Sequence, residues 1–200
     1  MAAKETPPLV VGVSGASGAI YGARLLDACR ELGLETHLVV SRAAVQTLRE
    51  ELGFSLGDLV AKASVSHRAG DIGAPIASGS FPTLGMIVAP CSVRTFSEIA
   101  TGVTSSLLTR AADVTLKERR LLVLMVRETP LHLGHLRSLM RLAEMGAVIA
   151  PPVPAFYAEP ASVDDMVDQA VGRALDLFGL AWSRTRRWSG PVPDGGGREA

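Results

Sequence analysis

The stretch LVVGVSGASGAIYGARLLDACRELG (residues 9–33) decides the fold. Its first five residues are all apolar, which is typical of a strand that is buried on both faces. Glycines and other small residues at 14–18 interrupt the run, and the residues after them place Leu25 and Leu26 on one helical face until Gly33 provides a stop. A buried strand, a glycine-rich turn and an amphipathic helix in this order predict a parallel α/β unit.

The same alternation continues along the chain. We predict strands at 9–13, 36–41, 85–90, 121–126 and 146–151, and helices at 20–33, 42–52, 92–101, 105–117, 132–145 and 162–178. Residues 63–82 have no clear period and are rich in Gly, Ser and Ala, so we predict a long connection there. The pattern indicates an α/β fold, with a parallel sheet covered by helices on both sides. One folded domain spans 9–180, after an N-terminal extension at 1–8. It is followed at 181–200 by a tail that we expect to be flexible at its end.

Composition limits the classes of function. Hydrophobic residues make up 48% of the 200 residues, so we expect a sizeable core. Twenty basic residues balance twenty acidic ones, and this lack of a basic excess argues against a nucleic acid or an anionic membrane as partner. The chain start does not have the pattern of a signal peptide, and the longest apolar runs, such as 121–126, are too short to span a bilayer. Two cysteines cannot build a disulfide framework, and we expect a soluble, cytoplasmic protein.

Candidate ligand-binding residues follow the predicted strands, because parallel sheets bind ligands beyond the carboxyl ends of their strands. The loop 14–18 offers backbone N–H groups at a helix N-terminus, which suit a phosphate, and Ser17 adds a hydroxyl. The loop has neither the lysine of a P-loop nor a full dinucleotide fingerprint, so a mononucleotide such as FMN suits it better than NAD. A tight strand-to-helix turn is an equally good interpretation of this loop alone.

Ser41 and Cys91 stand at the ends of the next two strands. Ser41 fits a helix N-cap, and together with Ser17 it also suits a shared phosphate. The segment 90–95 repeats the pattern. Cys91 lies in it without a nearby His–Asp pair, so we interpret this cysteine as a buried structural thiol rather than a nucleophile.

Several charged residues are candidates for chemistry. Glu51 lies in a charge run whose default interpretation is a solvated face. Arg110 and Lys117 share a helical face, again typical of a solvent-facing ladder, but lysine is scarce here because arginine supplies 17 of the 20 basic residues. That scarcity suggests a need for the compact charge of Lys117. Arg127 and Glu128 directly follow a strand beside the central crevice, where functional groups cluster.

Three further features lie in the last third of the chain. His132 and His135 form an H-x-x-H pair without a third ligand at suitable spacing, so we predict no metal. Tyr157 ends a stiff, proline-rich loop after a strand. Arg173 stands among apolar residues of the last helix, which makes a partnered role more plausible for it than for the arginines of the tail.

Five segments together resemble the flavin prenyltransferases of the UbiX family: SGASGAIYGARLL (14–26), ASGSFPT (77–83), APCS (89–92), RAADVTLKERRLLVLMVRETPLHLGHLR (110–137) and GAVIAPPVPAFYAEP (146–160). The likeness runs from about 9 to 180. It implies a Rossmann-like or flavodoxin-like three-layer sandwich that assembles as a homo-oligomer, a dodecamer, with active sites at subunit junctions. It also implies an enzyme that joins a dimethylallyl group from dimethylallyl phosphate to N5 and C6 of reduced FMN, without a metal. The product, prenylated FMN, would serve a UbiD-type decarboxylase.

The resemblance assigns roles to individual residues. It implies flavin contacts by Gly15, Ala16, Ser17, Ser41, Ser92, Val93, Arg94, Thr95 and Arg127. It implies binding of the prenyl donor by Ser78, Arg110, Lys117, Tyr157 and Arg173. Catalytic roles fall to Lys117, which would stabilise the departing phosphate, and to Glu51 and Glu128, which would handle protons.

Two other functions compete with prenyl transfer. One is a flavin-dependent cysteine decarboxylase of related fold, but such enzymes carry an active-site His and a PxMNxxMW-like stretch where this chain reads PCSVRTFSEI (90–99). The other is a non-catalytic FMN carrier, which would not need a second set of phosphate-binding residues. Arg94, Ser105-Ser106 and Leu121 depart from the family's usual residues, and none of these departures removes a phosphate ligand.

Overall fold

The computed structural model describes residues 6–190. Its strands form one six-stranded sheet, and every pair of neighbouring strands is parallel. The strand order is β3-β2-β1-β4-β5-β6, the doubly wound order that reverses between β1 and β4. The strands are β1 (Leu9–Val13), β2 (Thr36–Val40), β3 (Val65–His67), β4 (Gly85–Cys91), β5 (Leu121–Val126) and β6 (Val148–Ile149). The predicted α/β class is confirmed.

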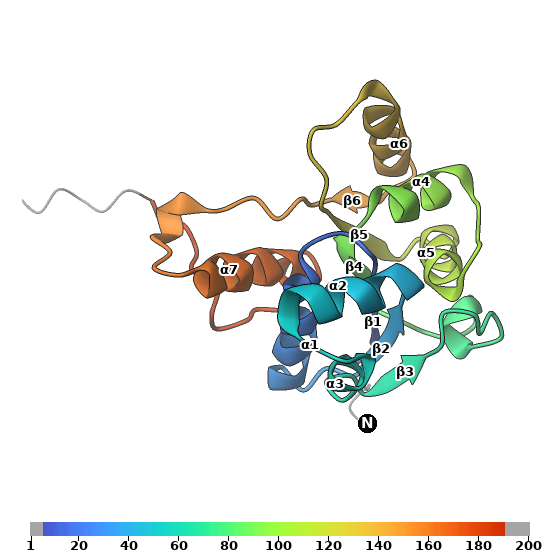
Figure 1. Cartoon of the computed structure of the whole chain (residues 1–200), viewed down its shortest axis with the longest axis horizontal. Helices are drawn as coiled ribbons and strands as arrows, with labels where there is room; N and C mark the ends of the chain where they lie inside the picture. The colour runs from blue at the N-terminus through green and yellow to red at the C-terminus, as the bar shows by residue number, and fades with distance from the viewer. Residues whose placement is uncertain (1–5, 191–200) are drawn as a thin grey trace, which may run out of the picture.

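Helices cover both faces of the sheet and give three layers (Figure 1). One face carries α1 (Ala19–Glu31), α2 (Arg42–Leu52), α3 (Leu56–Val60) and α7 (Val163–Asp176), and the other carries α4 (Val93–Thr101), α5 (Leu107–Lys117) and α6 (Leu133–Glu144). The strands are apolar on both sides because alternate residues enter opposite cores. In β1, for example, Val11 packs into the first core and Val10 into the second.

Hydrogen bonds of one side chain join the carboxyl ends of β1 and β4 at the point where the strand order reverses. The buried Ser14 hydroxyl donates to the carbonyl oxygen of Pro90 (2.7 Å) and accepts the backbone N–H of Ser92 (2.7 Å). This one side chain therefore fixes the loop after β1 against the start of α4.

The structure differs from the predicted elements mainly at the sheet edges. The connection predicted at 63–82 contains β3 and a short 3₁₀ helix, η1 (Pro75–Ala77), and α3 was not predicted. These elements have only three to five residues each, too few for a period to emerge. The last strand, predicted at 146–151, shrinks to Val148–Ile149, because Pro151 and Pro152 offer no N–H to extend a ladder.

After β6 the chain runs away from the sheet through a second 3₁₀ helix, η2 (Phe156–Ala158), and returns as α7, which packs beside α1 (Figure 1). Residues 181–188, which we call the strap, then lie against α1 and α7. Trp182 Nε1 and Arg184 Nη2 donate to the two carboxylate oxygens of Glu31 (2.7 and 2.6 Å), and Arg187 Nη2 donates to Asp176 (2.6 Å). The predicted flexible end of the tail, 191–200, lies outside the described residues, as do 1–5 of the predicted extension.

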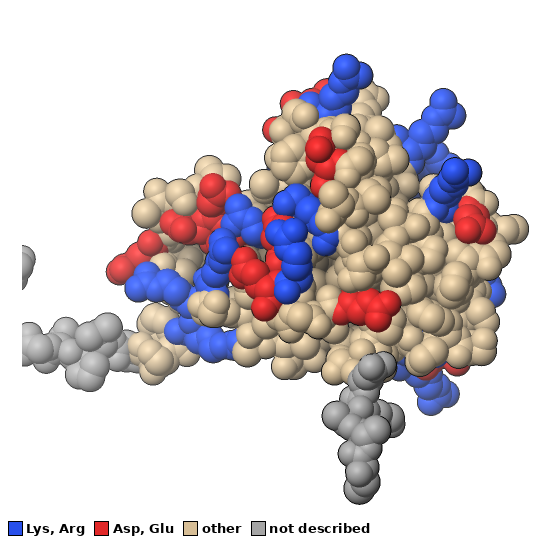
Figure 2. Space-filling model, turned by 90° about the horizontal axis from the view of Figure 1, so that it is seen from below, with Lys and Arg blue, Asp and Glu red and all other residues tan. Residues whose placement is uncertain are grey.

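Basic and acidic side chains lie next to one another on the face drawn in Figure 2, rather than in separate fields. Ion pairs of the described residues include Lys62–Asp27 (2.9 Å) and Arg187–Asp176 (2.6 Å). Within 6–190, the longest helix has 14 residues, and none is both long and apolar enough to cross a membrane.

Candidate active site

A hollow of about 460 Å³ opens at the switch point between β1 and β4, where the fold places ligands. Five residues that the sequence analysis assigned to the flavin line it together: Gly15, Ser41, Ser92, Arg94 and Thr95. They come from the loops after β1 and β2 and from the start of α4 after β4, segments that are far apart in the sequence. An added side chain at Gly15 would overlap the Cβ of Ala43 on α2, so only glycine lets this loop lie against the helix.

Two helices begin at the rim of the hollow, and each is capped by a serine. The Oγ of Ser41 accepts the N–H of Ala44 at the start of α2 (3.2 Å), and the Oγ of Ser92 accepts the N–H of Thr95 at the start of α4 (3.4 Å). The cap interpretation of Ser41 is confirmed. The remaining N–H groups of each first turn and the partial positive charge of each helix favour an anion in this hollow.

The loop at 14–18 already holds an anion, and that anion belongs to the chain itself. Glu51 Oε2 accepts the backbone N–H groups of Gly18 (2.8 Å) and Ala19 (2.9 Å) at the start of α1, and the Ser17 hydroxyl bonds to the same carboxylate. Partial burial acts to raise the pKa of Glu51, but these hydrogen bonds and the charge of Arg127 outweigh it and lower the pKa. Glu51 is exposed, as its default interpretation as a solvated charge predicts, and it also binds the start of α1, which the charge run did not indicate. Flavin contact by Ser17 stays a prediction.

Arg127 and Glu128 follow β5 at the same edge of the sheet. The backbone N–H of Arg127 donates to the carbonyl oxygen of Cys91 (3.1 Å), which ties this segment to the end of β4. Burial raises the pKa of Tyr21, and the nearby Arg127 guanidinium offsets part of that rise. The charge of Arg127 thus acts on both Tyr21 and Glu51. Glu128 is exposed, and its Oε1 accepts the N–H of Thr129 (2.9 Å).

A second group of predicted residues lies on the α5 side of the sheet. Arg110 on α5 donates to the carbonyl oxygen of Ala77 (3.3 Å) and to Asp113 (2.8 Å), which places it beside Ser78. Lys117 ends the same helix, next to Gly79, and is paired with Glu118. Ser78, Arg110 and Lys117 therefore form one cluster. Lys117 comes shortly before β5 and Arg127 directly after it. This cluster therefore extends to the amino ends of the strands, whereas Arg127 lies at their carboxyl ends.

The third group, Tyr157 and Arg173, lies on the α7 side. Arg173 lines a recess of about 230 Å³ together with Pro151 and Val153, and its Nη1 donates to Asp176 (2.7 Å). The Tyr157 hydroxyl accepts a hydrogen bond from Gln169 on α7 (3.2 Å). Within one chain the predicted site is thus divided among three places, with the sheet between the second group and the third.

Other residues of the hollow were not singled out by the sequence analysis. Glu98 accepts hydrogen bonds from Arg94 (2.8 Å) and Ser105 (2.6 Å). Partial burial acts to raise the pKa of Glu98, but these two donors outweigh it and lower the pKa. The i, i+4 spacing of Arg94 and Glu98 was a signal that could have found this pair. Two residues that depart from the family pattern, Arg94 and Ser105, therefore meet on one carboxylate.

The remaining candidates have structural roles. Cys91 is fully buried, and its burial raises the pKa of the thiol far above the usual range, as expected of a structural cysteine. His132 caps α6, because its Nδ1 accepts the N–H of Gly134 (3.0 Å), and its ring stacks on that of His135 at 3.5 Å. In the described part of the chain, no three His, Cys, Asp or Glu residues are grouped so that they could hold a metal ion.

Comparison with known proteins assigns the chain to a family. The model of the Flavoprotein family matches residues 2–175. The flavin prenyltransferase UbiX of Escherichia coli K12 is 59% identical over 185 residues, covering 91% of this chain and 98% of that protein.

Two solved structures have the same fold at high sequence identity. The crystal structure of AnUbiX (PadA1) in complex with FMN and dimethylallyl pyrophosphate has a TM-score of 0.92 and 46% identity, covering 94% of this chain and all of that one. The dodecameric FMN-dependent UbiX-like decarboxylase from Escherichia coli O157:H7 has a TM-score of 0.89 and 49% identity, covering 92% of this chain and all of that one. The predicted flavodoxin-like sandwich is confirmed, and the chain belongs to the UbiX family of flavin prenyltransferases.

Proposed function

We propose that this chain transfers a dimethylallyl group from dimethylallyl phosphate to N5 and C6 of reduced FMN, forming the prenylated FMN that a UbiD-type decarboxylase uses. The observation that carries the proposal is the hollow between β1 and β4, which gathers five of the nine predicted flavin residues in one place. Its volume of about 460 Å³ lies within the range of ligand pockets. The resemblance to a structure that holds both FMN and a prenyl donor supports the choice of ligands.

The flavin phosphate would lie between the starts of α2 and α4, where Ser41, Ser92 and Thr95 line the hollow. Unpaired N–H groups of two first helical turns suit a phosphate. Reduced FMN supplies the electron-rich acceptor that forms the new carbon bonds. Arg127 would contact the flavin from the far side of the loop after β1, because it lies beside Gly18 and its charge acts on Glu51.

Glu51 would serve as the proton acceptor. Its pKa is lowered by donors from the start of α1, so the carboxylate is ionised at neutral pH and has no proton to give. Glu128 is exposed one residue after Arg127, and it would supply or relay a proton on the donor side.

The leaving phosphate needs positive charge as its bond to the allylic carbon breaks. Lys117, Arg110 and Arg173 are the predicted cations, and charge-assisted contacts of this kind stabilise a developing anion. One chain keeps Lys117 on α5 and Arg173 on α7, on opposite faces of its sheet. The complete site would therefore form where several copies of the chain meet.

A homo-oligomer, which we take to be a dodecamer, fits the surface of the chain as well. Leu133 and Met140 on α6 are about 60% exposed, and Val153 and Phe156 on the segment after β6 are more than 70% exposed. Apolar side chains concentrated on two projecting elements mark an interaction surface. The Escherichia coli O157:H7 relative is itself described as dodecameric. Two free, buried cysteines agree with a reducing compartment, and we place the enzyme in the cytoplasm.

Anaerobic incubation of the protein with reduced FMN and dimethylallyl phosphate tests the proposal. Mass spectrometry of the extracted flavin should show the added C5H8 unit. A protein that binds FMN but never forms the adduct would support the carrier alternative, and release of CO2 from a peptidyl cysteine would support the decarboxylase alternative.

A further inference from the structure

Gln169 on α7 is a buried amide that links Tyr157 to the strap. Its side chain is 5% exposed, and its Nε2 donates both to the Tyr157 hydroxyl (3.2 Å) and to the carbonyl oxygen of Arg186 (2.8 Å). Its Oε1 accepts the backbone N–H of Arg186 (3.0 Å). A backbone carbonyl only accepts and a backbone N–H only donates, so the two contacts to Arg186 fix which end of the amide is which. Gln169 therefore presents an N–H group to Tyr157.

This polarity decides what the Tyr157 hydroxyl can do. A phenol has one hydrogen to donate, and its oxygen also accepts. Because Gln169 acts on Tyr157 as a donor, the phenol oxygen is the acceptor in that contact and its own hydrogen is directed elsewhere. An ionised phosphate offers only acceptor oxygens. Tyr157 is thus held in the form that suits a phosphate ligand.

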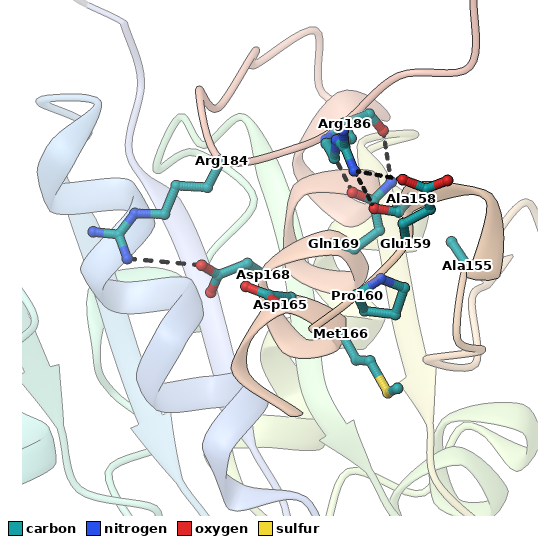
Figure 3. A pocket seen from close by; sticks show the side chains of 10 residues that line it. All are labelled: Ala155, Ala158, Glu159, Pro160, Asp165, Met166, Asp168, Gln169, Arg184 and Arg186. Carbon is teal, nitrogen blue, oxygen red and sulfur yellow. Dashed lines mark hydrogen bonds and ion pairs between the residues drawn. The ribbon is translucent and has the colours of Figure 1, made fainter. Parts of the chain in front are cut away.

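The strap fixes Gln169 in turn (Figure 3). Arg186 reaches over Gln169, and its Nη1 donates to the carbonyl oxygen of Ala158, the residue directly after Tyr157. The distance between these two atoms is 2.6 Å. From the other side, the ring of Trp188 meets the ring of Tyr157 edge-on, with 5.8 Å between the ring centroids. The tyrosine, the amide and the strap therefore form a closed set of contacts around η2.

We propose that Gln169 is a positioning residue for the prenyl donor: it holds the Tyr157 hydroxyl as a hydrogen-bond donor to the donor's phosphate, and the backbone of Arg186 in the strap holds Gln169 in that orientation. The inference rests on the proposed function, because it takes Tyr157 to be a ligand of dimethylallyl phosphate.

Gln169→Glu tests the polarity, because it keeps the shape of the side chain but replaces the donor with an acceptor. The introduced carboxylate would accept the Tyr157 hydrogen and turn it away from the phosphate. We expect the KM for dimethylallyl phosphate to rise roughly ten- to a hundredfold, the range for one hydrogen bond to a charged group. The Kd for FMN should not change. As the pH falls and the introduced carboxyl group is protonated, the defect in KM should shrink, and in the Tyr157→Phe background this pH dependence should be absent.

A double-mutant cycle with Tyr157→Phe identifies the route of the effect. If Gln169 acts through the phenol hydroxyl, Gln169→Glu should add little to the KM of Tyr157→Phe. Full additivity, or a normal KM for Gln169→Glu, would overturn the inference. Tyr157→Phe with a normal KM would remove the role of Tyr157 and the inference with it, while prenylated FMN would still form. No adduct from the wild-type protein would instead reject the proposed function.

Two further variants keep the test decisive. Gln46→Glu changes the chain's only other glutamine, which is exposed on α2, and should leave the KM for the donor unchanged. If Gln169→Glu does not fold, Gln169→Met removes the donor without adding charge, and it should raise the KM by a smaller factor while FMN is retained. An unchanged KM in a folded Gln169→Met protein would count against the inference.

Discussion

Co-assembly of Lys117→Ala chains with Arg173→Ala chains should restore an activity that neither variant has alone. Lys117 ends α5 on one face of the sheet, whereas Arg173 lies on α7 on the other face. Lys117 also precedes the six-residue strand β5 and Arg127 follows it, a separation of about 16 Å along the strand. A hydrogen bond spans about 3 Å. Because Lys117 is also on the opposite face of the sheet from Arg173, we expect a site that uses all three groups to take Lys117 from a different chain than Arg127 and Arg173.

The fraction of activity that returns equals the fraction of sites that hold both an intact Lys117 and an intact Arg173. Each homo-oligomeric variant loses one charge-assisted contact to the leaving phosphate, which costs roughly a hundred- to a thousandfold in turnover. In an oligomer with equal and random shares of the two variants, half of the sites receive an intact Lys117 and half receive an intact Arg173. About a quarter of the sites then hold both, so turnover should reach about a quarter of the wild-type value. If both residues came from one chain, no site would be intact.

The assay uses two differently tagged chains that are co-expressed and purified through both tags, with the chain ratio measured by mass spectrometry. Light scattering checks that each assembly has the wild-type size, and the rate of prenylated FMN formation gives the activity. Wild-type chains mixed with the Lys117→Ala/Arg173→Ala double variant provide the control. A shared site predicts about a quarter of wild-type activity in this control too, and a one-chain site predicts about half. Activity near half in the control with none in the variant mixture would refute the shared site.

Glu51→Gln should abolish prenyl transfer and lower the free energy of unfolding by about 0.3–1 kcal/mol, the range for an anion at a helix N-terminus. Because the folded-state pKa of Glu51 is lowered, urea denaturation should show this difference in full above the unfolded pKa of about 4.3 and should show it fading as the pH falls through the folded pKa. Gly15→Ala would overlap Ala43 and should lose co-purifying FMN, with a cost of about 1–3 kcal/mol, whereas Gly57→Ala has space for its methyl group and should retain FMN. Burial raises the pKa of the Cys29 thiol to about 12, so a thiol reagent at pH 8 should label it only after unfolding, and rapid labelling of the folded protein would contradict its burial.

The strands and long helices could be read from the sequence because their residues carry a period or an unbroken apolar run. LLVLMV at 121–126 is buried on both faces, and only the middle of a parallel sheet accepts such a segment. The edge strand β3 reads VSH, and all three of its residues are exposed or partly exposed. An edge strand of this length leaves no hydrophobic signature, so the sequence indicated only a connection.

The candidate site was predictable in its residue types and less so in its contacts. Serines after buried strands are typical of helix caps at a ligand edge, and Ser41 and Ser92 are both caps and lining residues. The contact of Glu51 with the start of α1 joins positions more than 30 residues apart, and a helical period carries no information about such a tertiary contact. Gln169 is a similar case, because it is one of several polar residues of α7 and the sequence does not show that it alone bonds to the strap.

The placement of Glu51 also decides where a flavin phosphate can bind. The loop after β1 has the small residues and the helix N-terminus of an anion site, and Gly18 and Ala19 already donate to this carboxylate. Two unit charges 4 Å apart repel by about 4 kcal/mol near a protein surface, which is more than a helix N-terminus returns to an anion. A phosphate at the same N–H groups would therefore have to displace Glu51. The starts of α2 and α4 are capped by neutral serines instead, and Glu98, the carboxylate that lines the hollow between them, is paired with Arg94 (2.8 Å). We therefore expect the phosphate in this hollow, where its binding leaves Glu51 in place at the start of α1.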